Sequence, residues 1–365
     1  MAPRIAAAPR DRTTDSAPVV GAPVHDDLAI ARTLLAAVLA ATESSAVGVS
    51  WAVAVLRGPS DGGVFITSNE GRGWLPAGVF LPQQVSTPWL WDEMLDDGTG
   101  RRSAPWEGIA DPARVLVEFG RVWGPRAGAE VTTLVSSGPI DPRLRAQLGS
   151  VAAVGGVGPT YDIDLRVQTP GTVDRLELTG SADDVDGVVA LSDTWLRNRC
   201  VELAADAHVR LGSTGPAPAE AAASAQLRDR ILANLQAGRE VPRQWWDELR
   251  DADELLAAIQ RTRRVPVAHM GLGDLRVDNA AGLRALVFQR RCTELVLLLD
   301  GETNRQQLRD AVYAHEQIVK HPVFADGPAA VSAPESGRYQ WPVDMRRITA
   351  ESNERVVSSD SNRWG

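Results

Sequence analysis

The segment from Val47 to Asn69 constrains the fold more than any other part of the chain, because its pattern predicts a β-hairpin. The run "VGVSWAVAVLR" (47–57) is rich in Val and Trp, "PSDGG" (59–63) supplies turn residues, and "VFITSN" (64–69) is a second β-prone run. After about residue 225, apolar residues recur at helical spacing instead. The sequence therefore predicts an α+β (mixed α/β) N-terminal domain followed by an all-α helical-bundle domain.

The first domain is predicted to span residues 26–211. Its first helix, from Asp26, places apolar residues on one face: Leu28, Ala31, Leu35 and Val38, ending near Thr42. Further helices are predicted at 88–95, at 111–123 with Val115, Phe119 and Val122 on one stripe, at 141–149, and at 183–211, where the helix should pack across the sheet. Two more strands are predicted at 129–137 and 161–168. This order of elements favours a sheet covered by helices.

The second domain is predicted at 225–322, after a Gly- and Pro-containing linker at 212–224. The first predicted helix carries Leu227, Ile231 and Leu235 on one stripe, and the second begins at Pro242 and carries Trp245, Leu249, Leu256 and Ile259. A third helix is predicted at 279–301, and a fourth is capped by Thr303 or Asn304. The segment "LVLLLDG" at the end of the third run has a buried strand as its alternative. Pro-rich composition predicts a disordered arm at 1–25 and an extended strap or tail at 323–365, including "YQWPVDM".

Charge and hydropathy exclude two classes of partner. The net charge is -9, with a pI near 5.2, so the long-range field of the protein repels nucleic acids and anionic lipid surfaces. The most apolar run starts at Leu28, contains Arg32 and follows Asp26 and Asp27, which is not the pattern of a secretory signal or a membrane span. We expect a cytoplasmic protein with no nucleic-acid partner and no membrane insertion.

The motifs of metal and nucleophile chemistry do not occur in the sequence. No His stands two residues before a Glu, and Cys200 and Cys292 are too far apart for a Cys-x-x-Cys metal site. Each cysteine lies at helical spacing among apolar residues, which predicts a core position. There is no Gly-x-Ser-x-Gly elbow, and "GGVGPTYD" does not match a dinucleotide fingerprint. We therefore predict no catalytic residue, no metal and no cofactor.

The loop "SNEGRGWLPAGVFLP" (68–82) concentrates turn residues and aromatic anchors. Its glycines permit positive φ and its prolines fix φ, so it should form a tight crossover packed against the hairpin. Asn69 and Glu70 are the polar residues at its start. They are candidates for recognising a ligand, and they can equally hydrogen-bond the amides of their own turn.

Tryptophans are the second group of candidate binding residues. Trp74, Trp89 and Trp91 lie close together in sequence and are suited either to a binding cleft or to the core. Trp245 and Trp246 are successive residues of one predicted helix, about 100° apart, so only one of them can point into the core. Trp246 is assigned here as the interface candidate.

The hairpin and loop "WAVAVLRGPSDGGVFITSNEGRGWLPAGVFLP", the helical second half and the run "WPVDMRRITAESNE" resemble conserved mycobacterial proteins of type VII secretion loci, including the C-terminal region of EspK. The likeness covers most of the chain after residue 25. It implies a two-domain module linked to secretion and contributes no catalytic residues. A single lysine, Lys320, among many arginines fits a GC-rich, actinobacterial origin.

One motif argues against an ordinary exported substrate of such systems. "WEG" at Trp106 fits the Trp-x-Gly element, but the residues four positions after Tyr161, Tyr313 and Tyr339 are Leu165, Gln317 and Val343, so the Tyr-x-x-x-Asp/Glu signal is absent. A cytosolic accessory role, or export with a partner, is therefore favoured.

Three functional hypotheses follow from the sequence. The first is a non-enzymatic module that binds a secretion-related protein partner. The second is a novel or degenerate enzyme that uses Glu70 and Asp92 in a Trp-lined cleft of the first domain. The third is a small-molecule or peptide sensor that uses the same cleft without chemistry.

Overall fold

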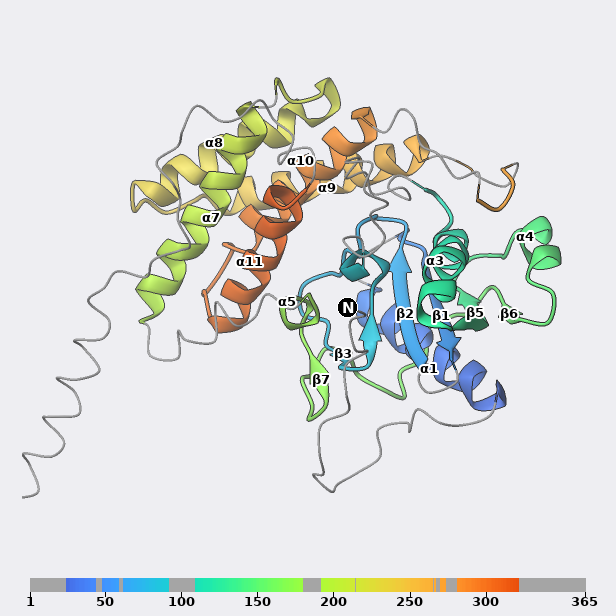
Figure 1. Ribbon diagram of the computed structural model, residues 1–365. Coiled ribbons are helices and arrows are strands. Elements are labelled where there is room, and N and C mark those ends of the chain that lie inside the picture. The colour runs from blue at the N-terminus through green and yellow to red at the C-terminus, as the bar shows by residue number, and fades with distance from the viewer. Residues whose placement is uncertain are drawn as a thin grey trace, which may run out of the picture. The chain divides into compact units, whose positions relative to one another are not determined.

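The computed structural model describes residues 24–43, 48–58, 62–91, 109–179, 192–213, 215–264, 266, 270–273 and 281–321. These residues belong to one compact unit of the chain, Met1–Pro322. Almost all of the predicted arm, and the whole predicted tail with "YQWPVDM", lie outside the described residues. Figure 1 shows a sheet with helices in the first half of the unit and helices alone in the second.

The predicted hairpin is confirmed and forms the centre of a five-stranded sheet with the order β4-β2-β1-β5-β6. Strands β1 (Trp51–Arg57) and β2 (Gly62–Ser68) are antiparallel, and Trp51 lies opposite Ser68. Strand β5 (Glu130–Ser136) runs antiparallel along the other edge of β1, with a register shift between Val55 and Leu56. The outer strands are short and parallel to their neighbours: β4 (Val85–Ser86) and β6 (Ala152–Val154).

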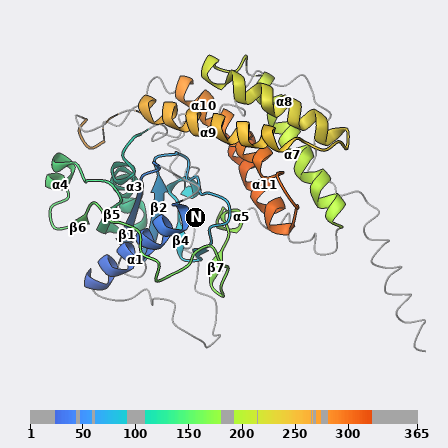
Figure 2. The ribbon, with the colours of Figure 1, turned by 180° about the vertical axis from the view of Figure 1, so that it is seen from behind.

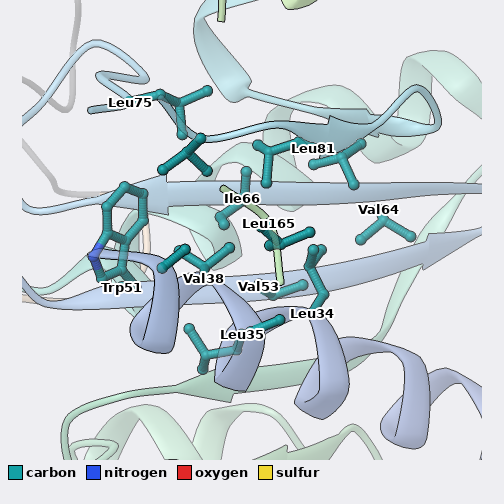
Figure 3. Packing of buried hydrophobic residues seen from close by; sticks show 14 of the residues in the cluster. Leu34, Leu35, Val38, Trp51, Val53, Val64, Ile66, Leu75, Leu81 and Leu165 are labelled. Carbon is teal, nitrogen blue, oxygen red and sulfur yellow. The ribbon is translucent and has the colours of Figure 1, made fainter. Parts of the chain in front are cut away.

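Helices pack on both faces of this sheet. Helix α1 (Val24–Thr42) covers one face, where Leu35 and Val38 pack with Trp51 and Val53 (Figure 3). Helix α3 (Pro112–Ala127) covers the other face. Its cluster includes Phe65, Leu116, Phe119 and Trp123. The sheet is therefore a middle layer with an apolar core on each side.

Helix α3 shows how local sequence sets the ends of an element. The Asp111 side chain accepts hydrogen bonds from the amides of Ala113 and Arg114, and the helix ends at Gly128, whose φ is 64°. Val122, predicted on the buried stripe, is 42% exposed. The buried face is centred on Leu116, Phe119 and Trp123, which turns Val122 toward solvent.

The remaining elements of the first half are short. They are the single-turn helix η1 (Pro88–Trp91), α4 (Pro142–Gln147), α5 (Arg175–Leu178), and the pair of strands β3 (Leu81–Pro82) and β7 (Thr172–Val173). The rest of the helix predicted at 88–95 lies outside the described residues.

The prediction of a strand at 161–168 was wrong. These residues are irregular, and they are attached to the molecule through the Leu165 carbonyl, which accepts a hydrogen bond from the Phe80 amide at 2.8 Å. Their alternating pattern had no neighbouring strand to pair with, and a strand needs a partner for its backbone groups.

The second half of the described chain is helical, as predicted. It contains α7 (Asp193–Ser213), η2 (Ala219–Ala221), α8 (Ala222–Gln236), α9 (Arg243–Arg263), α10 (Ala281–Leu297) and α11 (Arg305–Val319) (Figure 2). A turn rather than a strand follows α10, and Asn304 caps α11 with a reciprocal bond to Gln307. The separation into two domains stays a prediction.

The helix predicted at 183–211 was expected to pack across the sheet, and for its described part, α7, this was wrong; residues 183–191 lie outside the described residues. Its buried residues Leu196, Cys200, Leu203 and Ala207 belong to a helix that packs chiefly against α11, α10 and α8. Its apolar stripe is therefore matched by other helices rather than by the sheet. Among the described residues, no helix is both long and apolar enough to cross a membrane.

Candidate functional site

The loop 68–82 begins with a structural turn. The Asn69 amide donates to the Ser50 carbonyl at 3.0 Å, and the Asn69 Oδ1 accepts from the Ser50 amide at 3.0 Å. Gly73 has a φ of 60°, and a Cβ there would lie 2.7 Å from the Thr87 Oγ1. Asn69 therefore satisfies the backbone of its own hairpin, and Gly73 is required by both its conformation and the space around it.

Glu70 is the centre of a buried charge cluster. Its Oε1 lies 2.8 Å from the Arg264 Nη2, and its Oε2 lies 2.7 Å from both the Arg290 Nη1 and the Arg291 Nη2. The Glu70 side chain is only 2% exposed. Arg264 follows α9, and the other two arginines belong to α10, so one carboxylate of the loop is held by two helices.

The arginines determine how Glu70 titrates. Burial acts to raise the pKa of Glu70, but the charges of Arg290, Arg291 and Arg264 outweigh it and lower that pKa to about 2. Burial raises the pKa of Asp253, the carboxylate that lies 3.3 Å from the Arg290 Nη2. Glu70 is consequently ionised at neutral pH, so it is not available there as a general acid and is a weak general base.

A second set of contacts joins the same loop to α10 and α11. The Trp74 Nε1 donates to the Glu294 Oε2 at 2.9 Å. The Tyr313 hydroxyl donates to the Gly73 carbonyl at 3.2 Å and accepts from the Leu75 amide at 3.1 Å. Burial raises the pKa of Tyr313 to about 12. The loop is therefore bonded through its backbone as well as through Glu70.

Arg175, from α5, contacts the loop, α10 and α11 at the same time. Its Nε donates to the Asp310 Oδ1 at 2.6 Å, its Nη1 donates to the Leu75 carbonyl at 2.9 Å, and Nη1 also pairs with Glu294. The Arg291 Nη1 lies 2.7 Å from the Glu294 Oε2, which makes the contacts continuous with those of Glu70.

The complete set, called here the loop cluster, balances its charges. The acids are Glu70, Asp253, Glu294 and Asp310, and the bases are Arg175, Arg264, Arg290 and Arg291. Removing one member leaves a buried charge of the opposite sign without its partner, which is costly. The loop cluster therefore specifies which helical surface the loop contacts.

Trp74 and Trp89, for which the sequence left a cleft and the core as alternatives, lie in or against the cores on opposite faces of the sheet. Trp74 is 6% exposed, stacks on Trp51 at 6.5 Å, and belongs to the core on the α1 side of the sheet. Trp89 packs against the core on the α3 side. The Trp91 side chain and Asp92 lie outside the described residues.

The choice between the two adjacent tryptophans of α9 was wrong. Trp246, the predicted interface residue, is 5% exposed and lies in the core. Trp245 is half-buried, and the guanidinium of Arg230 lies 4.0 Å from the centre of its ring. Sequence spacing showed that only one of the two can be buried, but the neighbouring helices select which one.

Both cysteines are core residues, as predicted. Cys200 and Cys292 are free thiols and are buried. Burial raises the pKa of Cys200 to about 12 and also raises that of Cys292, so neither is a ready nucleophile. Within the described ranges, no three His, Cys, Asp or Glu side chains are placed to hold a metal ion.

The loop lines neither of two hollows in the described part of the chain. A smaller one, of about 420 Å³, lies beside Gln83 and Val173, and a groove of about 1020 Å³ lies between α3 and β5. The sequence had suggested Glu70 but not its partners. The adjacent Arg290 and Arg291, in a helix with many apolar residues, were the available signal.

Comparison with known proteins supports one relationship. No curated protein matches the chain. Residues 40–148 match the family model of the EspK C-terminal domain, a segment that runs from the end of α1 through the hairpin, loop 68–82 and α3 to the end of α4. The resemblance to the C-terminal region of EspK, a protein associated with type VII secretion, is thereby confirmed over these residues.

Proposed function

We propose that this chain is a non-enzymatic, cytoplasmic accessory protein that binds other proteins in a type VII secretion system of an actinobacterium. The match of residues 40–148 to the EspK C-terminal domain is the observation that carries the proposal. The matched segment includes the hairpin, the loop with Glu70, and α3.

The contacts of the polar residues at the start of the loop bear on the enzyme alternative. Asn69 bonds to the hairpin, and Glu70 is held by three arginines, so the two polar residues at the start of the loop are occupied by contacts inside the molecule. This gives no support to an enzyme built on Glu70, because a carboxylate with a pKa near 2 that is held by three arginines is a weak base at neutral pH.

Two exposed apolar positions offer places to detect a partner. Val167 lies in the irregular segment 161–168, and Leu255 lies on α9; their side chains are 58% and 61% exposed. Isolated apolar residues of this kind are common on protein surfaces, so they serve here as probe positions and not as evidence for an interface.

The test is photocrosslinking in the native host. A photoreactive phenylalanine analogue replaces Val167 in one variant and Leu255 in another, and crosslinked proteins are identified by mass spectrometry. We expect at least one variant to crosslink a component or substrate of the type VII system, and deletion of the gene to reduce export through it. Crosslinks exclusively to unrelated proteins, together with unchanged export after deletion, would refute the proposal.

A small-molecule or peptide sensor is the second candidate. The groove of about 1020 Å³ between α3 and β5 favours it, because a volume of that size accommodates a short peptide or a cofactor-sized molecule. A small molecule that stays with the protein through purification, and is found by native mass spectrometry, would favour the sensor over the accessory role.

A further inference from the structure

Strand β5 is paired along only half of its outer side. Strand β6 pairs with residues 133–135, and Glu130 and Val131 pair only with β1. Thr132 is the extra residue at the register shift and has no strand partner. In the described parts of the chain, no other hydrogen bond reaches the backbone of Glu130, Val131 or Thr132. This half of β5 is therefore an open strand edge.

The chain before β6 turns away and leaves the edge open. Gly149 has a φ of 59°, and the Val151 amide donates to the Leu148 carbonyl at 3.1 Å, so residues 148–151 form a turn after α4. The outer side of β6 is different, because the Arg145 Nη2 donates to the Ala153 carbonyl at 3.0 Å. The open backbone beside the groove is therefore that of residues 130–132.

A groove of about 1020 Å³ lies beside this edge. Its walls include Gly120, Leu148, Val151 and Leu272 together with Val131 of the strand. A Cβ at Gly120 would lie 2.4 Å from the Val131 Cγ2, so the glycine lets α3 approach β5 closely. The surface next to the open backbone is therefore mostly apolar and suited to small side chains.

The rim of the groove carries charges of both signs: Glu130 of the strand is exposed, Arg57 is paired with Asp27, and Arg121 is the exposed cation. The Arg121 side chain is 48% exposed, and its Nη1 lies 3.6 Å from the Glu118 Oε2. Glu118 is buried and is also paired with Arg114 at 2.9 Å, while both of its oxygens accept the Gly273 amide at 3.0 Å. One carboxylate thus serves two guanidinium groups, and the exposed one is incompletely neutralised.

We propose that this groove binds an extended peptide segment of a partner protein, which adds a strand beside Glu130–Thr132. Its backbone would satisfy the open edge, a small apolar side chain would pack near Gly120 and Val131, and an acidic side chain would face Arg121. Strand addition of this kind obtains affinity from main-chain bonds and specificity from the alternating side chains. The inference deepens the proposed function and rests on it, because it names the surface and the chemistry of the partner.

Hydrogen exchange on the full-length chain tests whether the edge is free. We expect the outward amides of residues 130–132 to exchange at least about tenfold faster than those of residues 133–135, which β6 covers. Equal protection of the two groups would show that another part of this chain already occupies the edge, and this would overturn the proposal.

Peptide binding tests the chemistry of the occupant. The probe is a pool of blocked, fluorescent eight-residue peptides in which small apolar and polar residues alternate around one fixed Glu. A matched pool has Lys at that position, and a third has alternate amides of the Glu pool N-methylated. We expect saturable binding of the Glu pool with slower exchange at 130–132, about tenfold weaker binding of the Lys pool, and loss of binding on N-methylation.

Two charge reversals complete the test. Arg121→Glu should weaken binding of the Glu pool about tenfold, whereas Arg143→Glu, an exposed change on α4 that does not line the groove, should leave it unchanged. No saturable binding, or binding insensitive to N-methylation, would overturn the inference. Because the purified protein is used, that failure is distinct from a failure of crosslinking to secretion components in cells.

Discussion

The apolar cores around the hairpin and the loop cluster are both buried, but different forces hold them. Around β1 and β2, residues such as Val53, Ile66 and Phe119 contact other apolar groups on both faces of the sheet. Around Glu70, four acids and four arginines are buried or partly buried together. A buried apolar side chain can pack against many other apolar side chains of similar volume, whereas each buried charge requires an opposite charge at a defined place. The apolar cores therefore stabilise the fold, and the loop cluster selects the surface that the loop contacts.

The largest effect should come from Glu70→Gln, which keeps the shape of the side chain and removes its charge. Three arginines would then lose their shared carboxylate, and we expect the free energy of unfolding to fall by about 3–5 kcal/mol. Urea denaturation followed by Trp fluorescence measures this change. Glu254→Gln, an exposed change on α9, is the matched control and should alter stability by less than about 0.5 kcal/mol. Equal stability of the two variants would contradict the proposed role of the cluster.

Lowering the pH to about 2 should remove most of the difference in the free energy of unfolding between the wild type and Glu70→Gln. The folded-state pKa of Glu70 is lowered from 4.5 to about 2, so its stabilising contribution is present above pH 4.5 and is lost as the pH falls through about 2. A shift of this size corresponds to roughly 3 kcal/mol. Urea denaturation of both proteins from pH 7 to pH 2 measures the difference, in which titrations common to both proteins largely cancel. A difference that stays constant over this range would mean that Glu70 acts through its shape and not its charge.

A similarly small change of a side chain in the apolar core should lower the free energy of unfolding by much less than Glu70→Gln does. Ile66→Val removes one methylene group from a fully buried residue of β2, and we expect a loss of about 1 kcal/mol. The same urea assay at pH 7 gives this value directly, and the result should not depend on pH between 7 and 4.5. A loss as large as that of Glu70→Gln would remove the distinction between the two regions.

The smallest effect is expected at Trp245 on the helical surface. Arg230→Ala removes a guanidinium 4.0 Å from the indole ring, in an exposed setting where such contacts contribute about 0.5–1 kcal/mol. A double-mutant cycle with Trp245→Leu isolates the pairwise term. A coupling near zero would leave the Trp245 ring free to contact a partner.

Much of the first half could be predicted because its signals are local. The Val-rich runs and the intervening turn predicted β1 and β2, and Asp111 with Pro112 marked the start of α3. The strand predicted at 161–168 failed where the local pattern was present but a neighbouring strand was not. Local chemistry specifies an element only when its edges and faces also find partners.

The candidate site was less accessible from sequence. Glu70 and Trp74 were identified, but Arg290 and Glu294, which contact them, lie 220 positions further along the chain. The spacing of Trp245 and Trp246 showed that one of the two is buried, and it offered no means of choosing which. Contacts between residues far apart in the chain leave no periodic pattern, so they could not be predicted from this sequence alone.

The amino-acid pattern was thus sufficient for the hairpin, the helical second half, the core positions of both cysteines and the resemblance to the EspK C-terminal region, because each depends on residues close together in the chain. The role of loop 68–82 depended on the folded molecule. Its glycines and its Asn69 form a crossover, as its composition suggested, but the folded chain brings Glu70 to the arginines of α9 and α10. Burial then makes those charges depend on one another, since water no longer screens or solvates them.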